Sequence, residues 1–154
     1  MQLRLLCAVF LSAAALPAAD WGPVQFLVGN WKGVGGGAPG QRTGEFSFTP
    51  DVQGKVLVRR SFAEFAAARH DDLIIVYREK GQLRAIFFDS EDHVIHYAVR
   101  SIEGGVQFVS DDPGPRFRLT YISTGKDVVK IKFEVAPPGK EFSTYIDASA
   151  RREP

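Results

Sequence analysis

The chain has 154 residues, of which 45% are hydrophobic and 24% are charged, as in an ordinary soluble globular protein. Its 19 Lys and Arg residues nearly balance its 18 Asp and Glu residues, so the formal net charge is only +1. This balance creates no overall field for nucleic acid or for an anionic membrane surface, and we expect neither partner. The length fits one domain with a core of its own.

The first nineteen residues differ in composition from the rest. A basic residue, an apolar run over 5–16 and two alanines follow one another within 1–19. This order is typical of a secretory signal peptide, and the run is shorter than the ~20 residues that span a membrane. We therefore expect a mature chain, 20–154, that is secreted or periplasmic and not inserted in a membrane. A buried N-terminal helix is the alternative.

The mature chain is expected to begin with a short turn of helix and a strand. Trp21 stands at its start, where chains are often loosely held. Val24–Val28 fits one helical turn, and Phe26–Val34 reads as the first strand, with Trp31 as its largest apolar side chain. Gly35–Gly40 is rich in glycine and is expected to be a loop. No helix signal follows this loop, which argues against a phosphate-binding loop.

Further strands are expected along the rest of the chain, because alternating apolar and polar residues recur between turns rich in Gly, Pro and Asp. The expected strands are Thr43–Thr49, Lys55–Phe65, Asp72–Arg78, Gln82–Phe88, His93–Arg100, Gly105–Ser110, Arg116–Ile122, Val128–Val135 and Phe142–Ala150.

The segment Val128–Val135 has the clearest alternation in the chain. Such a pattern predicts one buried face and one solvent-exposed face. The expected buried residues are Val129, Ile131, Phe133 and Val135, and the expected exposed residues are Lys130, Lys132 and Glu134.

The segment Lys55–Phe65 allows two interpretations. Ser61 and Glu64 have the spacing of a capping box, and three alanines follow, which favours a helix. The alternation before them favours a strand, which we expect to reach about Phe65.

The pattern amounts to about ten short strands with no long helix. Parallel strands need long crossover connections, and the chain has none, so the sheet is expected to be an antiparallel meander. Closure into an up-and-down β-barrel removes both exposed edges, and a β-sandwich is the alternative.

The order of these features resembles the calycin superfamily of lipocalin-like barrels. The shared features are Gly29-Asn30-Trp31 on the first strand, a helical turn before it, consecutive antiparallel hairpins and an Arg after the last strand. The chain is also similar to a family of small exported bacterial domains with a lipocalin-like barrel and no established activity. The motifs are Trp31-Lys32-Gly33, Gly54-Lys55-Val56-Leu57, Phe87-Phe88-Asp89-Ser90 and Ala150-Arg151-Arg152.

The resemblance implies a structural closure of one barrel end. Trp31, next to Gly29, would pack under the barrel and meet Arg151 or Arg152, whose guanidinium would stack on the indole. The glycines after Trp31 also resemble those of haem-binding barrels called nitrobindins. Those barrels place a ligating His late in the chain, and this chain has no His after His96. We therefore expect no cofactor.

The adjacent arginines Arg59 and Arg60 stand on the third expected strand, so one of them faces inward. We assign Arg60 to the cavity side together with Phe62, and expect its guanidinium to reach the rim or to pair with Glu64. The alternative is a buried cation that meets an anion, such as a ligand carboxylate. Further candidates for the cavity wall are the aromatic residues Tyr77, Phe87, Tyr121 and Phe133.

No residue pattern in the sequence identifies a reaction. His93 and His96 are three residues apart on one expected strand, so they point to opposite faces and are not expected to share a metal. The Asp residues stand in turns, where Asp is common for backbone reasons. The chain also lacks the Gly-x-Ser-x-Gly nucleophile elbow. We expect no catalytic residue and no metal site.

These observations predict an exported barrel that binds a small, mostly apolar molecule. Two other classes stay open: a cavity-based isomerase or hydrolase, and a structural or interaction module of the cell envelope with a filled core. An inward polar pair in a cavity would favour the enzyme, and a packed, dry interior would favour the module. The sequence makes no prediction of the oligomeric state.

Overall fold

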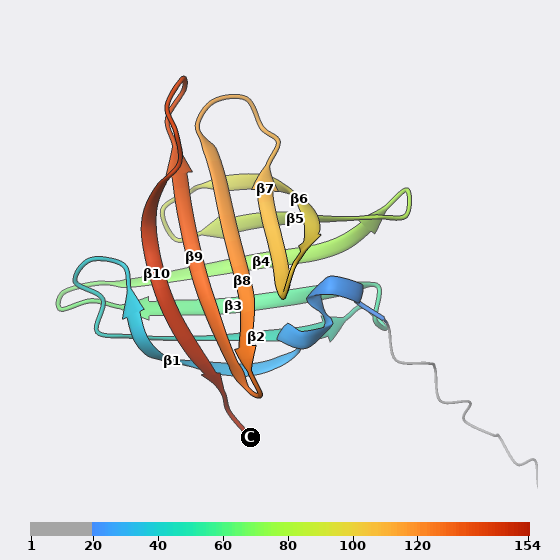
Figure 1. The fold of residues 1–154 in the computed structure, drawn as a ribbon, viewed down its shortest axis with the longest axis horizontal. Helices are drawn as coiled ribbons and strands as arrows, with labels where there is room; N and C mark the ends of the chain where they lie inside the picture. The colour runs from blue at the N-terminus through green and yellow to red at the C-terminus, as the bar shows by residue number, and fades with distance from the viewer. Residues whose placement is uncertain (1–19) are drawn as a thin grey trace, which may run out of the picture.

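The computed structural model describes residues 20–154, so the expected signal peptide lies outside the described residues. Ten antiparallel strands pair in chain order, and β1 also pairs with β10, which closes the barrel (Figure 1). The expected up-and-down barrel is confirmed, and the β-sandwich is excluded. The elements are η1 (Gly22–Leu27), β1 (Gly29–Gly37), β2 (Thr43–Asp51), β3 (Val56–Glu64), β4 (Arg69–Glu79), β5 (Gln82–Asp89), β6 (Val94–Ile102), β7 (Gly105–Ser110), β8 (Arg116–Gly125), β9 (Val128–Ala136) and β10 (Ser143–Arg152).

The short 3₁₀ helix η1 packs against one end of the barrel, which we call the closed end (Figure 1). Pro23 stands in its first turn, where a missing N–H costs nothing, and Val24 and Leu27 are fully buried. Trp21 is only 2% exposed and belongs to the same core, so the expectation that it is loosely held is wrong. Among the described residues, no helix has both the length and the apolar character needed to cross a membrane.

The glycine-rich segment after Trp31 is largely strand, contrary to the loop that was expected. β1 continues to Gly37, and Gly35, Gly36 and Gly37 pair with Ser149, Ala148 and Asp147 of β10 across a register shift. A Cβ on Gly36 would collide with the Asp147 carbonyl oxygen, so glycine permits this close approach of the two backbones.

The third strand resolves the choice between strand and helix in favour of strand. β3 ends at Glu64, and the alanine-rich residues after it form the connection to β4 at the end of the barrel opposite η1. We call that opposite end the open end. All nine residues of β3 pair with β2, and the same nine pair with β4.

The barrel interior is tightly packed at the closed end and hollow at the open end. The fully buried side chains of the packed half include Leu27, Trp31, Phe48, Leu57, Ile74, Val76, Val106, Phe108 and Tyr121. Phe117, Ile131 and Phe133 point inward nearer the open end and are only partly buried, because they line a cavity.

The faces of β9 follow the expected alternation with one exception. Val129 is buried, and the other three inward residues line the cavity, while Lys130 and Lys132 are exposed. Glu134 is only 5% exposed although it lies on the outer face, so its expected exposure is wrong. Arg118 on β8 donates to both of its carboxylate oxygens, at 2.6 and 2.9 Å, and Lys132 lies 3.0 Å away. These long side chains cover the carboxylate.

Candidate ligand-binding site

Trp31 closes the barrel end beneath η1. Its indole Nε1 donates to the Leu27 carbonyl at 2.8 Å, and its ring stacks on Phe46 with centroids 5.9 Å apart. The guanidinium of Arg152 lies over the Trp31 ring, 4.3 Å from its centroid. Arg151, the other candidate, is exposed.

Arg152 also ties the last strand to η1. Its guanidinium donates to the carbonyls of Val28 and Phe26, the latter at 2.8 Å, and to Asp127 at 3.0 Å. Gly29 has φ +126°, and a Cβ there would lie 2.7 Å from Arg152 Nη1. Glycine is therefore required beside this guanidinium, and the contact set holds the closed end together rather than performing chemistry.

A cavity of about 440 Å³ occupies the open half of the barrel. Its walls are mostly aromatic and aliphatic, which suits the body of an apolar ligand. The apolar wall residues include Phe46, Phe87, Ile95, Phe117, Leu119, Ile131, Phe133, Val135, Ile146 and Ala148.

A buried ion pair stands at the inner end of this cavity, between Arg59 of β3 and Asp72 of β4. Arg59 is only 8% exposed, and its guanidinium also lies 5.3 Å from the centroid of the Phe46 ring. Burial lowers the pKa of Arg59, but the Asp72 carboxylate and two nearby tyrosines more than offset this, so the net pKa is raised and the guanidinium stays charged.

Two tyrosines surround this ion pair. Tyr97 of β6 lines the cavity, and Tyr121 of β8 lies behind the pair in the packed core. Burial raises the pKa of Tyr97, and it raises the pKa of Tyr121 to about 12 against the opposing effect of Arg59. Both phenols are therefore protonated at neutral pH. Burial leaves the Tyr121 hydroxyl without a hydrogen bond among the described residues.

A second polar group lies at the mouth of the cavity. Asp89, at the end of β5, accepts from His93 Nδ1 at 2.9 Å, and His70 Nδ1 lies 3.3 Å from Glu91. The bond to Asp89 raises the pKa of His93. Burial raises the pKa of Asp89, but its hydrogen bonds with His93 and the Glu91 backbone outweigh this and leave the pKa lowered.

Within residues 20–154, no group of three or more His, Cys, Asp or Glu side chains is arranged to hold a metal ion. His96 points away from the mouth cluster and contacts Asp112 at 3.0 Å. His93 and His96 thus have separate carboxylate partners.

The structure brings only part of the predicted cavity set together. Phe87 and Phe133 line the cavity, and Phe62 lies at its border. Tyr121 is fully buried below its floor and belongs to the packed core.

Arg60 and Tyr77 lie on the outer face, so their assignment to the cavity is wrong, whereas Phe62 borders both the cavity and the groove outside the barrel. β3 has apolar residues on both faces, and alternation alone did not show which face is inside. In the structure Leu57 and Arg59 face inward, and Arg60 is exposed. The inward Asp72 on β4 neutralises Arg59, which decides the orientation.

The residues missed from the sequence are Arg59, Asp72 and Tyr97. One signal for the pair was available, because a hairpin between β3 and β4 sets Ser61 opposite Asp72 and leaves Arg59 as its diagonal neighbour. Nothing in the sequence indicated the orientation of Tyr97.

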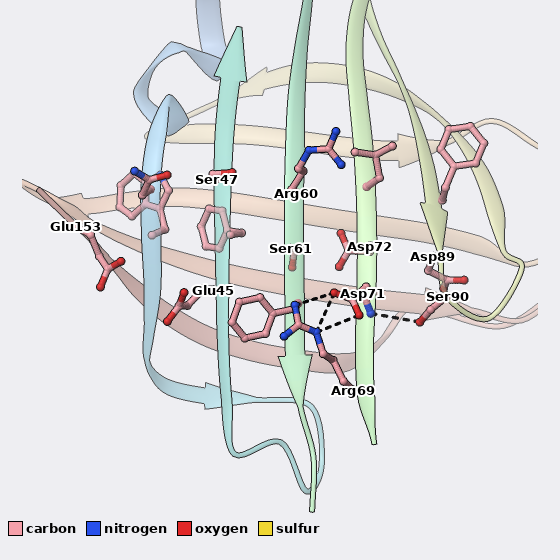
Figure 2. Close-up of a pocket in the computed structure, with 16 residues that line it drawn as sticks. Glu45, Ser47, Arg60, Ser61, Arg69, Asp71, Asp72, Asp89, Ser90 and Glu153 are labelled. Atoms are coloured by element: carbon pink, nitrogen blue, oxygen red, sulfur yellow. Dashed lines mark hydrogen bonds and ion pairs between the residues drawn. The ribbon is translucent and has the colours of Figure 1, made fainter. Parts of the chain in front are cut away.

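A second hollow, of about 630 Å³, lies outside the barrel over β2–β5 (Figure 2). Figure 2 shows Arg69 paired with Asp71, and Arg60, Ser47 and Glu45 on neighbouring strands. Arg69 lies 2.9 Å from Asp71 and its guanidinium is 4.0 Å from the centroid of the Phe62 ring. Arg69 pairs with Asp71 and Glu45 pairs with Lys32, and the groove is exposed and polar, so its larger volume is a weaker indication of a site than the apolar cavity inside.

A scan against protein-family models finds no match for this chain, and a search of curated proteins finds no similar sequence. The class is therefore defined by the fold alone: a closed ten-stranded antiparallel β-barrel, compatible with a lipocalin-like fold.

Proposed function

We propose that the barrel binds a small, mostly apolar molecule in its internal cavity. The observation that supports this is the contrast between the two halves of the interior. The closed half is filled with fully buried side chains, whereas the open half leaves about 440 Å³ between apolar walls. Protein interiors normally pack to the density of organic crystals, so a barrel selected only for stability would be expected to fill this space. A module with a filled core is accordingly disfavoured.

A cavity-filling variant tests the proposal. Ala148 on β10 lines the cavity, and the next residue toward the N-terminus, Asp147, is exposed on the outer face. Ala148→Phe places a ring in the space, and Asp147→Phe adds the same ring outside. Titration with the fluorescent apolar probe 1-aminoanthracene should show at least a tenfold loss of affinity for Ala148→Phe and less than twofold for Asp147→Phe, with both variants folded by circular dichroism.

A third variant addresses the outer groove. Phe88 lies there and is 37% exposed, so Phe88→Ser removes an apolar contact from that groove without touching the interior. If Phe88→Ser weakens probe binding and Ala148→Phe does not, the ligand binds outside the barrel and the proposal is wrong.

A cavity-based enzyme is the second candidate, because Arg59 and Asp72 form the inward polar pair that such an enzyme would use. Binding remains the first choice, since Arg59 stays charged and its partner carboxylate is already engaged, which leaves neither free for proton transfer. Turnover of an ester or an epimerisable ketone that is lost in Asp72→Asn, with probe binding retained, would favour the enzyme.

We also propose that this binding takes place outside the cytoplasm, and that the chain is related to the exported lipocalin-like domains that it resembles. The leader-like residues 1–19 support export, and the order of short motifs along the mature chain supports the relationship.

A further inference from the structure

The inner end of the cavity has more hydrogen-bond donors than acceptors. A guanidinium has five N–H groups, and Arg59 uses one of them for its hydrogen bond to Asp72. Its Nε is buried without a partner, as is the Tyr121 hydroxyl behind it. The Tyr97 hydroxyl, which lies beside the cavity, makes no hydrogen bond with any described residue either. Among the residues that the structure describes beside Arg59, Asp72 supplies the carboxylate.

Buried donors without a protein partner are costly unless water or a ligand accepts their hydrogen bonds. The raised pKa of both phenols means that they remain O–H donors at neutral pH rather than becoming acceptors. An acceptor atom at the end of a ligand would satisfy the donors that face the cavity, namely the free N–H groups of Arg59 and the hydroxyl of Tyr97.

The charges around the cavity decide whether this acceptor is an anion. Among the described residues of the wall, Arg59 is the only permanently charged cation, and Asp72 already neutralises it. Three further carboxylates, Glu45, Asp89 and Glu91, also border the cavity. A carboxylate ligand would pass these groups and come to rest beside an ion pair with no net charge, so no unpaired cation would offset the loss of its hydration.

We propose that the ligand is electrically neutral and carries a hydrogen-bond acceptor, such as a ketone, ester or amide carbonyl, which lies against Arg59 and Tyr97 at the inner end of the cavity. This inference rests on the proposed function and specifies its ligand class: an apolar body that contacts the aromatic walls, with one uncharged polar end. It also gives the buried pair a role, since Asp72 holds Arg59 in place and cancels its charge.

Three probes of matched shape test the proposal. 2-Acetylnaphthalene carries the ketone, 2-isopropylnaphthalene is a hydrocarbon of similar shape, and 2-naphthoate carries an anion. Their affinities are measured by displacement of 1-aminoanthracene at about pH 8, where ordinary histidines are neutral. The ketone should bind about tenfold more tightly than the hydrocarbon, as expected for a hydrogen bond from a charged donor after desolvation, and the anion should bind most weakly.

Two variants test whether Arg59 and Tyr97 cause the preference for the ketone over the hydrocarbon. Tyr97→Phe removes one hydroxyl with little change of shape, and should reduce the preference for the ketone over the hydrocarbon about threefold. The double variant Arg59→Met with Asp72→Leu replaces the pair by apolar side chains, which folded proteins often tolerate, and should abolish most of the preference while leaving hydrocarbon binding intact. Tyr77→Phe, on the outer face, is the matched control and should change neither affinity.

The outcomes separate the two proposals. Equal binding of ketone and hydrocarbon, a preference that survives both variants, or tightest binding of the anion would each overturn the neutral-acceptor inference while leaving a working cavity. Failure of all three probes and of 1-aminoanthracene to bind would instead overturn the proposed function itself.

Discussion

Arg152→Met should destabilise the protein far more than Arg151→Met, although the two arginines are neighbours on the same strand. Arg152 gives its hydrogen bonds to the carbonyls of Phe26 and Val28 and to Asp127, and it covers the Trp31 ring. A hydrogen bond to a charged group contributes ~1.5–3 kcal/mol, but the Arg152 side chain is still 31% exposed, so water replaces part of the loss. We expect a cost of about 2–4 kcal/mol.

Arg151 is exposed and makes no side-chain hydrogen bond or ion pair among the described residues. Its substitution should therefore stay within ~0.5 kcal/mol, as is usual for surface positions. Urea unfolding followed by the fluorescence of the two tryptophans gives both values. Equal, small losses for the two variants would refute the assignment of Arg152 as the residue that closes the barrel.

A double-mutant cycle isolates the contact between Arg152 and Trp31. Trp31 is 2% exposed, and Trp31→Ala should cost ~3–5 kcal/mol. The double variant should cost less than the sum of the single variants by ~0.5–3 kcal/mol, because both remove one contact. Trp21 would be a poor control here, since it is equally buried.

Three further predictions concern ionisation and export. His93 has a raised pKa because of Asp89, so its contribution to stability is present below about pH 6.5 and is lost as the pH rises through the raised value; NMR titration should show a lower His93 pKa in Asp89→Asn. Glu134 has a lowered pKa, chiefly because of Arg118, so its contribution is present at neutral pH and is lost as the pH falls through the lowered value. Glu134→Gln should therefore lower the Tm more at neutral pH than at about pH 3, and equal decreases would contradict this. Mass spectrometry of protein recovered outside the cytoplasm should show a chain that begins at or beside Asp20, and an intact leader in that fraction would exclude cleavage.

The fold was predictable because its main signals are local. Period-two alternation and turn residues depend only on neighbouring positions, and with no long crossovers they leave an antiparallel meander as the simplest arrangement. The error in the segment Gly35–Gly37 came from a distant partner. A glycine-rich sequence taken alone predicts a loop. In the structure Gly36 instead permits close pairing with Ala148, more than a hundred residues away in the chain.

The site was less predictable, because the orientation of its residues also depends on partners that are distant in the sequence. Phe87 and Phe133 were found because aromatic residues in alternating strands are common in barrel interiors. The choice between Arg59 and Arg60 needed the position of Asp72, since an arginine faces inward at acceptable cost only where a carboxylate meets it. Alternation identifies two faces of a strand, but on β3 only the partner strand decided which face lies inside.

The hollow half of the barrel makes stability depend on the closed end. Cavities left by core substitutions cost ~24 cal/mol per Å³, which for an empty space of 440 Å³ would amount to about 10 kcal/mol, comparable with the whole stability of a typical domain. A space of this size with polar groups at both ends is therefore expected to hold water when no ligand is bound. A ligand that replaces this water against the apolar walls binds the folded state alone, so it should raise the Tm as its concentration exceeds the Kd. Ala148→Phe should raise the Tm without ligand and weaken this ligand-dependent increase, because the ring occupies the space that the ligand needs.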